Sequence, residues 1–173
     1  MKGRKTWQLG YAAGVIDSDG CITIGRHNKV INGNTFTNYR LEVIVGQTDG
    51  RAVDFLFGTF GGYIHKRNAL PPNRPFIYRW EIRGEKAMKL LKRLIPFLRI
   101  KREQAELAIQ FQSIRTRNPR NRFTGKFDSS RYEGLHNRMK ELKTLWLPSA
   151  AAETKWNEAN NISQAIVQTP TNN

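Results

Sequence analysis

The stretch from Tyr11 to Gly20, which reads Y-A-A-G-V-I-D-S-D-G, constrains this chain more than any other. Its first part has helical character, and two pairs of residues within or beside it, Gly10 with Gly14 and Ala13 with Asp17, are spaced four apart. Residues four apart lie on one side of a helix. The spacing therefore predicts a helix face of small residues, which lets a second backbone approach closely.

The end of this predicted helix is acidic. The sequence Asp17-Ser18-Asp19-Gly20 places two carboxylates at the negative end of the helix dipole, where they are disfavoured. Such a placement calls for a compensating cation, and carboxylate oxygens suit Mg²⁺. The alternative is an ordinary turn between a helix and a strand, because Asp-Ser-Asp-Gly is also a common turn composition.

Residues 12 to 20 resemble the motif that gives the LAGLIDADG family of homing endonucleases its name. Ala12, Val15 and Ser18 depart from the pattern, at positions where the family accepts small or aliphatic residues. The resemblance covers residues 7 to 147 in the order of elements and includes the segment from Leu94 to Lys101. It implies an α+β fold with an αββαββα core, additional C-terminal helices and a saddle-shaped antiparallel sheet that binds DNA.

The charge of the chain is strongly unbalanced. Its 173 residues, enough for one domain with a core, include 29 Lys and Arg against 14 Asp and Glu, a net charge of +15. This excess indicates a polyanionic partner, nucleic acid before an anionic membrane, although a merely solvated basic surface is the alternative. No apolar run is long enough to span a bilayer. We expect no membrane partner and no small-molecule substrate.

The remaining composition excludes several other classes of protein. Cys21 is the only cysteine, so no internal disulfide forms, and no Cys/His cluster has zinc spacing. The start, Met1 to Lys5, is basic but has no apolar segment after it, so we expect no secretion.

Periodicity outlines the rest of the chain. Alternating apolar residues predict two strands, over residues 21–29 and 35–46, joined by a turn at Asn32-Gly33-Asn34. The elements predicted after this hairpin are a helix over 49–60 capped by Asp49, strands over 63–67 and 76–82, helices over 85–94 and 100–114, a basic loop over 115–127, and a last helix that begins at Ser129 or Ser130. We expect a single domain over residues 1–148 and a polar tail over 149–173.

Runs of strands with helices on one side suggest an antiparallel sheet whose other face is solvated. A twisted sheet with a polar, basic face can lie in the major groove of DNA and read base edges, although most polar sheet faces are simply solvated. The residues predicted to contact DNA from this face are Thr23, His27, Lys29, Arg40, Glu42, Ile44, His65, Arg67 and Arg79.

The resemblance also implies roles in catalysis. Asp19 corresponds to the metal-binding aspartate at the end of the motif helix, and the main-chain carbonyl of Ser18 faces the metal. Gln47 lies where the family places a polar residue in the water network around the scissile phosphate. Arg51 and Lys101 match positions that are basic near the active site; without the resemblance, these two and Gln47 are ordinary surface residues.

The chain carries one copy of the motif, and family members with one motif resemble homodimers whose motif helices pack along a two-fold axis. The predicted dimer interface consists of Gly10, Ala13, Gly14 and Asp17, with Asp17 also expected to act as a cap. Such a dimer brings two copies of Asp19 together beneath the DNA and favours a pseudo-palindromic target.

The sequence therefore favours a site-specific double-strand DNA endonuclease that uses Mg²⁺, with Mn²⁺ or Ca²⁺ accepted at the same site. The resemblance implies a gene within an intron and action in the compartment that encodes it, an organelle or a prokaryotic cytoplasm. The alternatives are a non-catalytic DNA-binding regulator or an RNA-splicing maturase on the same fold, and a basic ribosome-associated protein.

Overall fold

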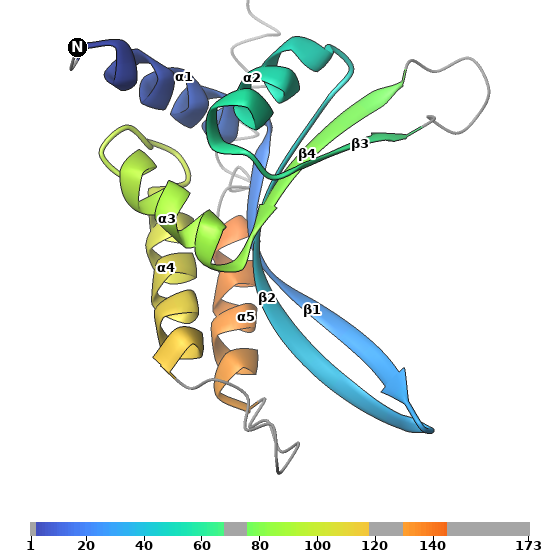
Figure 1. The fold of residues 1–173 in the computed structure, drawn as a ribbon. Helices are drawn as coiled ribbons and strands as arrows, with labels where there is room; N and C mark the ends of the chain where they lie inside the picture. The colour runs from blue at the N-terminus through green and yellow to red at the C-terminus, as the bar shows by residue number, and fades with distance from the viewer. Residues whose placement is uncertain (1–2, 68–75, 118–129, 145–173) are drawn as a thin grey trace, which may run out of the picture.

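The structure is a computed structural model that describes residues 3–67, 76–117 and 130–144. Its elements follow one another as α1 (Gly3–Asp19), β1 (Gly20–Ile31), β2 (Asn34–Gln47), α2 (Gly50–Phe60), β3 (Tyr63–Arg67), β4 (Ile77–Arg83), α3 (Gly84–Leu94), α4 (Arg102–Arg117) and α5 (Ser130–Thr144) (Figure 1). The predicted αββαββα order with further C-terminal helices is confirmed.

The four strands form one antiparallel sheet in the order β1-β2-β4-β3. β1 and β2 pair along their whole length, from Gly20 opposite Val45 to Ile31 opposite Asn34. Their hairpin turns at Asn32 and Gly33, which both have positive φ (50° and 76°), as the commonest two-residue hairpin turn requires. The predicted hairpin is therefore confirmed, with strands slightly longer than expected.

One face of the sheet supplies the core. Ile22, Ile24, Leu41, Val43 and Val45 alternate along β1 and β2, and each is fully buried. Figure 1 shows the helices α1 to α5 gathered on one side of the sheet, while the β1–β2 and β3–β4 arms extend away from them in different directions. The helices thus cover the apolar face and leave the opposite, concave face of the sheet open.

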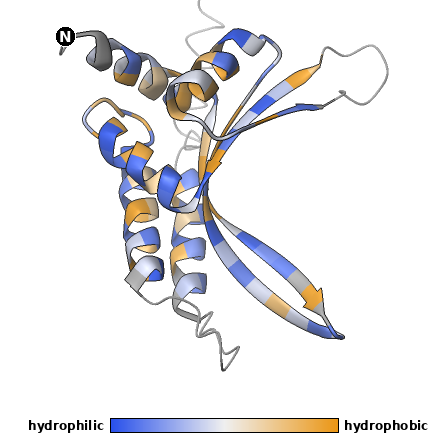
Figure 2. Cartoon of the chain, viewed as in Figure 1, coloured by the Kyte–Doolittle hydropathy of each residue, from blue (hydrophilic) through white to orange (hydrophobic). Residues whose placement is uncertain are grey.

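The open arms are mainly polar. Figure 2 shows hydrophilic colours along most of β1 and β2 where these strands project beyond the helices. In the three described ranges, no helix combines the length and the apolar character needed to cross a membrane.

The last two helices brace the sheet from behind. α4 continues to Arg117, so the prediction of a loop from residue 115 is wrong at its start. The reason is a tertiary contact: the Arg115 guanidinium donates to the Tyr39 carbonyl and, at 3.3 Å, to Asn38 Oδ1 of β2. In α5, His136 Nδ1 lies 2.6 Å from the Ile24 carbonyl oxygen. The rest of the predicted loop (118–127) and the predicted tail (149–173) lie outside the described residues.

Gly20 joins α1 to β1 in a space too small for a side chain. A Cβ atom at this position would meet the backbone of Ile16, 2.5 Å from its carbonyl oxygen and 2.7 Å from its Cα. Backbone atoms cannot move aside as a flexible side chain can. The turn that delivers Asp19 therefore depends on glycine at this position.

We predict that Gly20→Ala lowers the free energy of unfolding by about 1–3 kcal/mol, the usual effect of overpacking a tight site. Gly58→Ala is the control, because a Cβ at this α2 glycine meets nothing within 4 Å. There the gain in helix propensity should leave stability unchanged or raise it by up to about 1 kcal/mol. Urea unfolding followed by circular dichroism measures both, and equal stabilities for the two variants would contradict the prediction.

Candidate functional site

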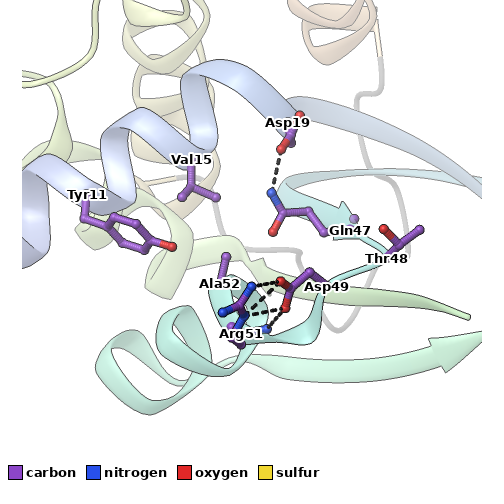
Figure 3. A pocket seen from close by; sticks show the side chains of 9 residues that line it. Tyr11, Val15, Asp19, Gln47, Thr48, Asp49, Arg51 and Ala52 are labelled. Carbon is purple, nitrogen blue, oxygen red and sulfur yellow. Dashed lines mark hydrogen bonds and ion pairs between the residues drawn. The ribbon is translucent and has the colours of Figure 1, made fainter.

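Two chain segments meet at the end of the motif helix. Asp19 is the last residue of α1 and is exposed, and Gln47 is the last residue of β2. The Gln47 side-chain amide donates to Asp19 Oδ2 at 2.5 Å (Figure 3). The antiparallel hairpin explains this meeting, because it returns the end of β2 to the start of β1, directly after Asp19.

Asp19 and Gln47 stand at one side of an open pocket (Figure 3). One wall comes from a single stripe of α1, where residues spaced four apart share a face. The other wall is the end of β2 and the start of α2. The lining residues are Tyr11, Val15 and Asp19 of the first wall, and Gly46, Gln47, Thr48, Asp49, Arg51 and Ala52 of the second.

Arg51 lies in this pocket but is paired. Asp49 caps α2, as predicted, by accepting a hydrogen bond from the Arg51 backbone N–H at 3.0 Å. The same carboxylate also accepts from the Arg51 guanidinium, at 2.9 Å and 3.0 Å from Nε and at 2.5 Å from Nη2. These bonds lower the pKa of Asp49 from 3.8 to about 2 and raise the pKa of Arg51.

The side chain of Lys101, from the connection before α4, reaches the C-terminal end of α1. Its ammonium donates to the carbonyl oxygens of Ile16, Asp17 and Ser18 at 2.9, 2.5 and 3.3 Å. The compensating cation expected at this negative helix end is thus present in the chain itself. Burial lowers the pKa of Lys101, against the opposite effect of the nearby Asp17, Cys21 and Asp19. Lys101 reaches the helix end beside Asp19 but does not line the pocket.

The main-chain carbonyl of Ser18, expected to face a metal, accepts the longest of these three bonds. A carbonyl oxygen has two lone pairs, so this contact leaves an acceptor position on it.

Asp17 is a cap within its own chain, which is one of the roles predicted for it. Its carboxylate accepts from the backbone N–H groups of Arg99, at 2.7 Å, and Lys101, at 3.0 Å. These groups lie just before α4, where the positive end of the helix dipole favours a carboxylate. The side chain of Asp17 is thus directed at the α3–α4 connection of its own chain, and its place in a dimer interface stays a prediction.

The small residues that were predicted to share one face of α1 lie on two different faces of the helix. Ala13 is 1% exposed and packs in the core of its own chain, which leaves its side chain little surface for a second copy. Neighbouring residues of an α-helix point about 100° apart, which separates Ala13 from Gly14. Gly10 and Gly14 are exposed, and a Cβ at either would meet nothing within 4 Å. These two remain available to a second copy.

The strand register places the predicted DNA-contacting residues on the open face of the sheet. Thr23 pairs with Glu42, which pairs with Arg83, and Arg79 pairs with His65. Their even spacing along the strands puts His27, Arg40 and Ile44 on the same side. The side chains of Lys29 and Arg67 lie outside what the structure describes.

Glu42 lies on the predicted face of the sheet, but its side chain is buried where an exposed one was expected. Its side chain is 8% exposed and accepts from Arg40, with His27 Nε2 at 3.1 Å. A carboxylate that already has these two basic side chains as partners is not an open acceptor for a base edge. The prediction that Glu42 itself contacts DNA stays untested, but its carboxylate is occupied within the chain.

The sequence analysis does not predict three residues of these two surfaces. Tyr11 was seen only as the start of the motif, although it lines the Asp19 pocket. Glu81 and Arg83 lie on the open sheet face with Arg79. The two-residue alternation of β4 that contains Arg79 also contains Glu81, and its next step gives Arg83.

The described residues contain no group of three or more His, Cys, Asp and Glu side chains that could hold a metal ion. A metal bound at the end of α1 would thus find one uncommitted carboxylate of this chain, that of Asp19. A complete oxygen ligand set requires another contributor, such as a phosphate or a second copy of this helix end.

We predict that Arg51→Gln returns the pKa of Asp49 from about 2 towards 3.8, because the guanidinium hydrogen bonds are the largest cause of its depression. The side-chain carboxyl ¹³C shift, followed through a pH titration, measures this value. Arg102→Gln is the control, since it removes an exposed arginine that pairs with Glu106 instead. An unchanged Asp49 titration in Arg51→Gln would contradict the pairing.

Several solved structures share this fold. The homing endonuclease I-CvuI in complex with a DNA target has a TM-score of 0.62 and 22% identity, over 80% of this chain and 83% of that one. The archaeal intron-encoded homing endonuclease I-Vdi141I, complexed with DNA, has a TM-score of 0.62 and 16% identity, over 80% and 85%. The homing endonuclease I-TnaI has a TM-score of 0.52 and 17% identity, over 79% and 95%.

No protein-family model matches the sequence, and no curated protein is significantly similar to it. The arrangement of helices and strands is what this chain shares with the solved structures, at identities too low to transfer activity. The chain has the fold of the LAGLIDADG homing endonucleases.

Proposed function

We propose that this protein is a LAGLIDADG homing endonuclease that hydrolyses both strands of a specific DNA site as a homodimer. The observation that carries the proposal is the Asp19–Gln47 pair, which stands at a pocket at the end of the motif helix. A protein that only binds DNA gains nothing from an exposed carboxylate directed at phosphates, since like charges repel. The intron location of the gene is part of the proposal and has a parallel in I-Vdi141I.

Double-stranded DNA is the substrate that the charge and shape of the protein favour. The net charge of +15 attracts a polyanion, and the open face of the sheet is concave and polar (Figures 1 and 2). A twisted antiparallel sheet of this kind fits the major groove. The I-CvuI and I-Vdi141I structures are complexes with DNA, which supports the same partner for this chain.

The oxygen donors at the end of α1 fit a divalent metal. The Asp19 carboxylate is exposed and is bound by a neutral amide rather than by a cation, so its charge remains available. A bound Mg²⁺ would supply Lewis-acid polarisation of the phosphate and a lower pKa for its attacking water. Two-metal sites hold carboxylates on both sides of the phosphate, which one chain does not provide.

The protein side chains around Asp19 have separate tasks in this hydrolysis, in which water attacks phosphorus and the 3′ oxygen leaves. The Gln47 amide orients Asp19 and holds the attacking water near it. Arg51, whose side chain is 90% exposed, stabilises negative charge on the phosphate once it leaves Asp49. Lys101 fixes the helix end that carries Asp19 and adds positive charge behind it.

The second copy is expected on the exposed side of α1. Gly10 and Gly14 offer a flat surface there. Beside them, Trp7 and Tyr11 are 56% and 45% exposed, and both rings pack against Phe55 of α2. Exposed aromatic side chains next to two glycines are typical of a surface that another protein covers. A two-fold axis along this surface would bring the two Asp19 residues together.

We predict that Asp19→Asn lowers the cleavage rate at least about a hundredfold, because an amide is a poor Mg²⁺ ligand. Binding in metal-free buffer should equal or exceed that of the wild type, since a negative charge beside phosphates is removed. Cleavage and gel-shift assays on one folded preparation test both expectations. Asp54→Asn, at an exposed α2 residue outside the pocket, is the matched control.

Near-wild-type cleavage by Asp19→Asn at saturating enzyme would refute the catalytic role of Asp19. Specific binding without cleavage by the wild-type protein, in Mg²⁺ or Mn²⁺, would instead favour the DNA-binding regulator. Tight binding of intron RNA in place of DNA would favour the maturase.

We also predict a homodimer of about 40 kDa at micromolar concentration, twice the 20.0 kDa chain. Gly14→Leu should give monomers and abolish cleavage, because the side chain would hold the two motif helices apart. Analytical ultracentrifugation measures the mass, and Gly58→Leu controls for an added side chain at an open helix position. A dimeric, active Gly14→Leu protein would show that the interface lies elsewhere.

A further inference from the structure

Two glutamates are buried on the face of the sheet that none of the described helices, α1 to α5, covers. Counted over the whole residue, Glu42 of β2 is 6% exposed and Glu81 of β4 is 3% exposed. Both nevertheless lie on the open side of the sheet by strand register. Burial of a carboxylate is costly unless cations and hydrogen bonds compensate for the lost water. The side chains that cover these two glutamates must therefore be held close to them.

Five basic side chains provide this cover. Arg40 donates to Glu42 Oε1 from Nε at 2.8 Å and from Nη2 at 2.5 Å, and His27 Nε2 lies 3.1 Å from the same oxygen. Glu81 has His65 Nε2 at 3.1 Å and Arg79 Nη2 at 3.7 Å. We call the set the two-glutamate cluster: Glu42, Glu81, His27, Arg40, His65, Arg79 and Arg83.

Arg83 joins the two halves of the cluster. Its Nη2 contacts Glu81 Oε1, and its Nε lies 3.8 Å from Glu42 Oε1. Register explains the bridge, since Arg83 pairs with Glu42 across β2 and β4 and follows Glu81 by two residues on the same face. One guanidinium thus couples carboxylates from neighbouring strands, so neither half is independent of the other.

The charges of the cluster argue against a role in affinity. Three guanidiniums and two carboxylates leave one net positive charge when the histidines are neutral. Without the glutamates, the same surface would attract phosphates more strongly. The carboxylates therefore reduce the attraction for DNA at the centre of the face that meets it.

The glutamates do orient the arginine side chains around them. Arginine has five N–H donors in a rigid planar fork, and fixing the fork with one carboxylate leaves other donors for base edges. A side chain that is already ordered loses less conformational entropy when it contacts a base. It also contacts fewer alternative bases, which sharpens discrimination.

We propose that Glu42 and Glu81 are positioning residues for sequence discrimination, which set the directions in which Arg40, Arg79 and Arg83 meet base-edge acceptors. This inference rests on the proposed function, because it requires specific DNA binding by the open sheet face. It assigns no base contact to either glutamate. Loss of one glutamate should therefore loosen the preference at several neighbouring base pairs, in contrast to the single position that a direct reader controls.

The test compares Glu42→Gln, Glu81→Gln and Glu106→Gln in selections over randomised target sites, in metal-free buffer at one salt concentration. Glu106 is the control, because its exposed pair with Arg102 lies on α4. For Glu42→Gln and Glu81→Gln we expect broader preference at adjacent positions and a ratio of specific to non-specific affinity lower by about tenfold. Their non-specific affinity should rise, as removal of a carboxylate increases the net positive charge.

Thermal unfolding confirms that each variant is folded. If either glutamine variant does not fold, the corresponding aspartate variant, Glu42→Asp or Glu81→Asp, replaces it, because the shorter side chain keeps the charge but moves the carboxylate away from the guanidiniums it holds. A preference that is unchanged, or changed at a single base pair, would overturn the inference while the proposed function stands. A wild-type protein without any site preference would overturn both.

Discussion

The reciprocal cap between α1 and α4 is the interaction on which the candidate site depends. Asp17, near the end of α1, accepts from two backbone N–H groups that precede α4, and Lys101, from that same connection, donates to three carbonyls at the end of α1. An ammonium has three donors, so three carbonyls satisfy it completely despite its burial. Each helix thus receives the charge that its dipole favours, and the position of Asp19 is fixed from both sides.

Three nearby carboxylates, those of Asp17, Asp19 and Asp49, have different partners in this arrangement. Asp17 is committed to backbone N–H groups, and Asp49 is committed to the cap of α2 and to the Arg51 guanidinium. Asp19 is held by the neutral amide of Gln47, which orients a carboxylate without cancelling its charge. Of these three groups, Asp19 is consequently the one suited to a cation from outside the chain. Position in the motif does not explain this difference, since Asp17 belongs to the same motif. The hydrogen-bond partners of each side chain explain it.

Local rules predicted the features of this fold that depend on local chemistry. The hairpin turn at Asn32-Gly33, the Asp49 cap and the alternation of β1 and β2 follow from backbone preference and period, and the structure confirms them. Contacts between distant segments were not predictable in this way. Helical spacing alone could not show that Ala13 faces its own core, nor that Lys101 would end at the carbonyls of α1. The burial of Glu42 depends on Arg83, which lies 41 positions further along the chain and is aligned with it only by strand register.

If the protein binds DNA as proposed, the charge pattern of the sheet would separate affinity from discrimination. A net charge of +15 would give strong binding to any DNA if it were spread evenly over the open face. The structure instead places two buried glutamates among the arginines at the centre of that face, which lowers the local charge where bases would be read. Phosphate contacts position a protein on DNA, whereas base contacts carry sequence information. An ordered centre of low net charge within a basic protein suits that division, because phosphate attraction at the centre would stabilise every register on the DNA equally.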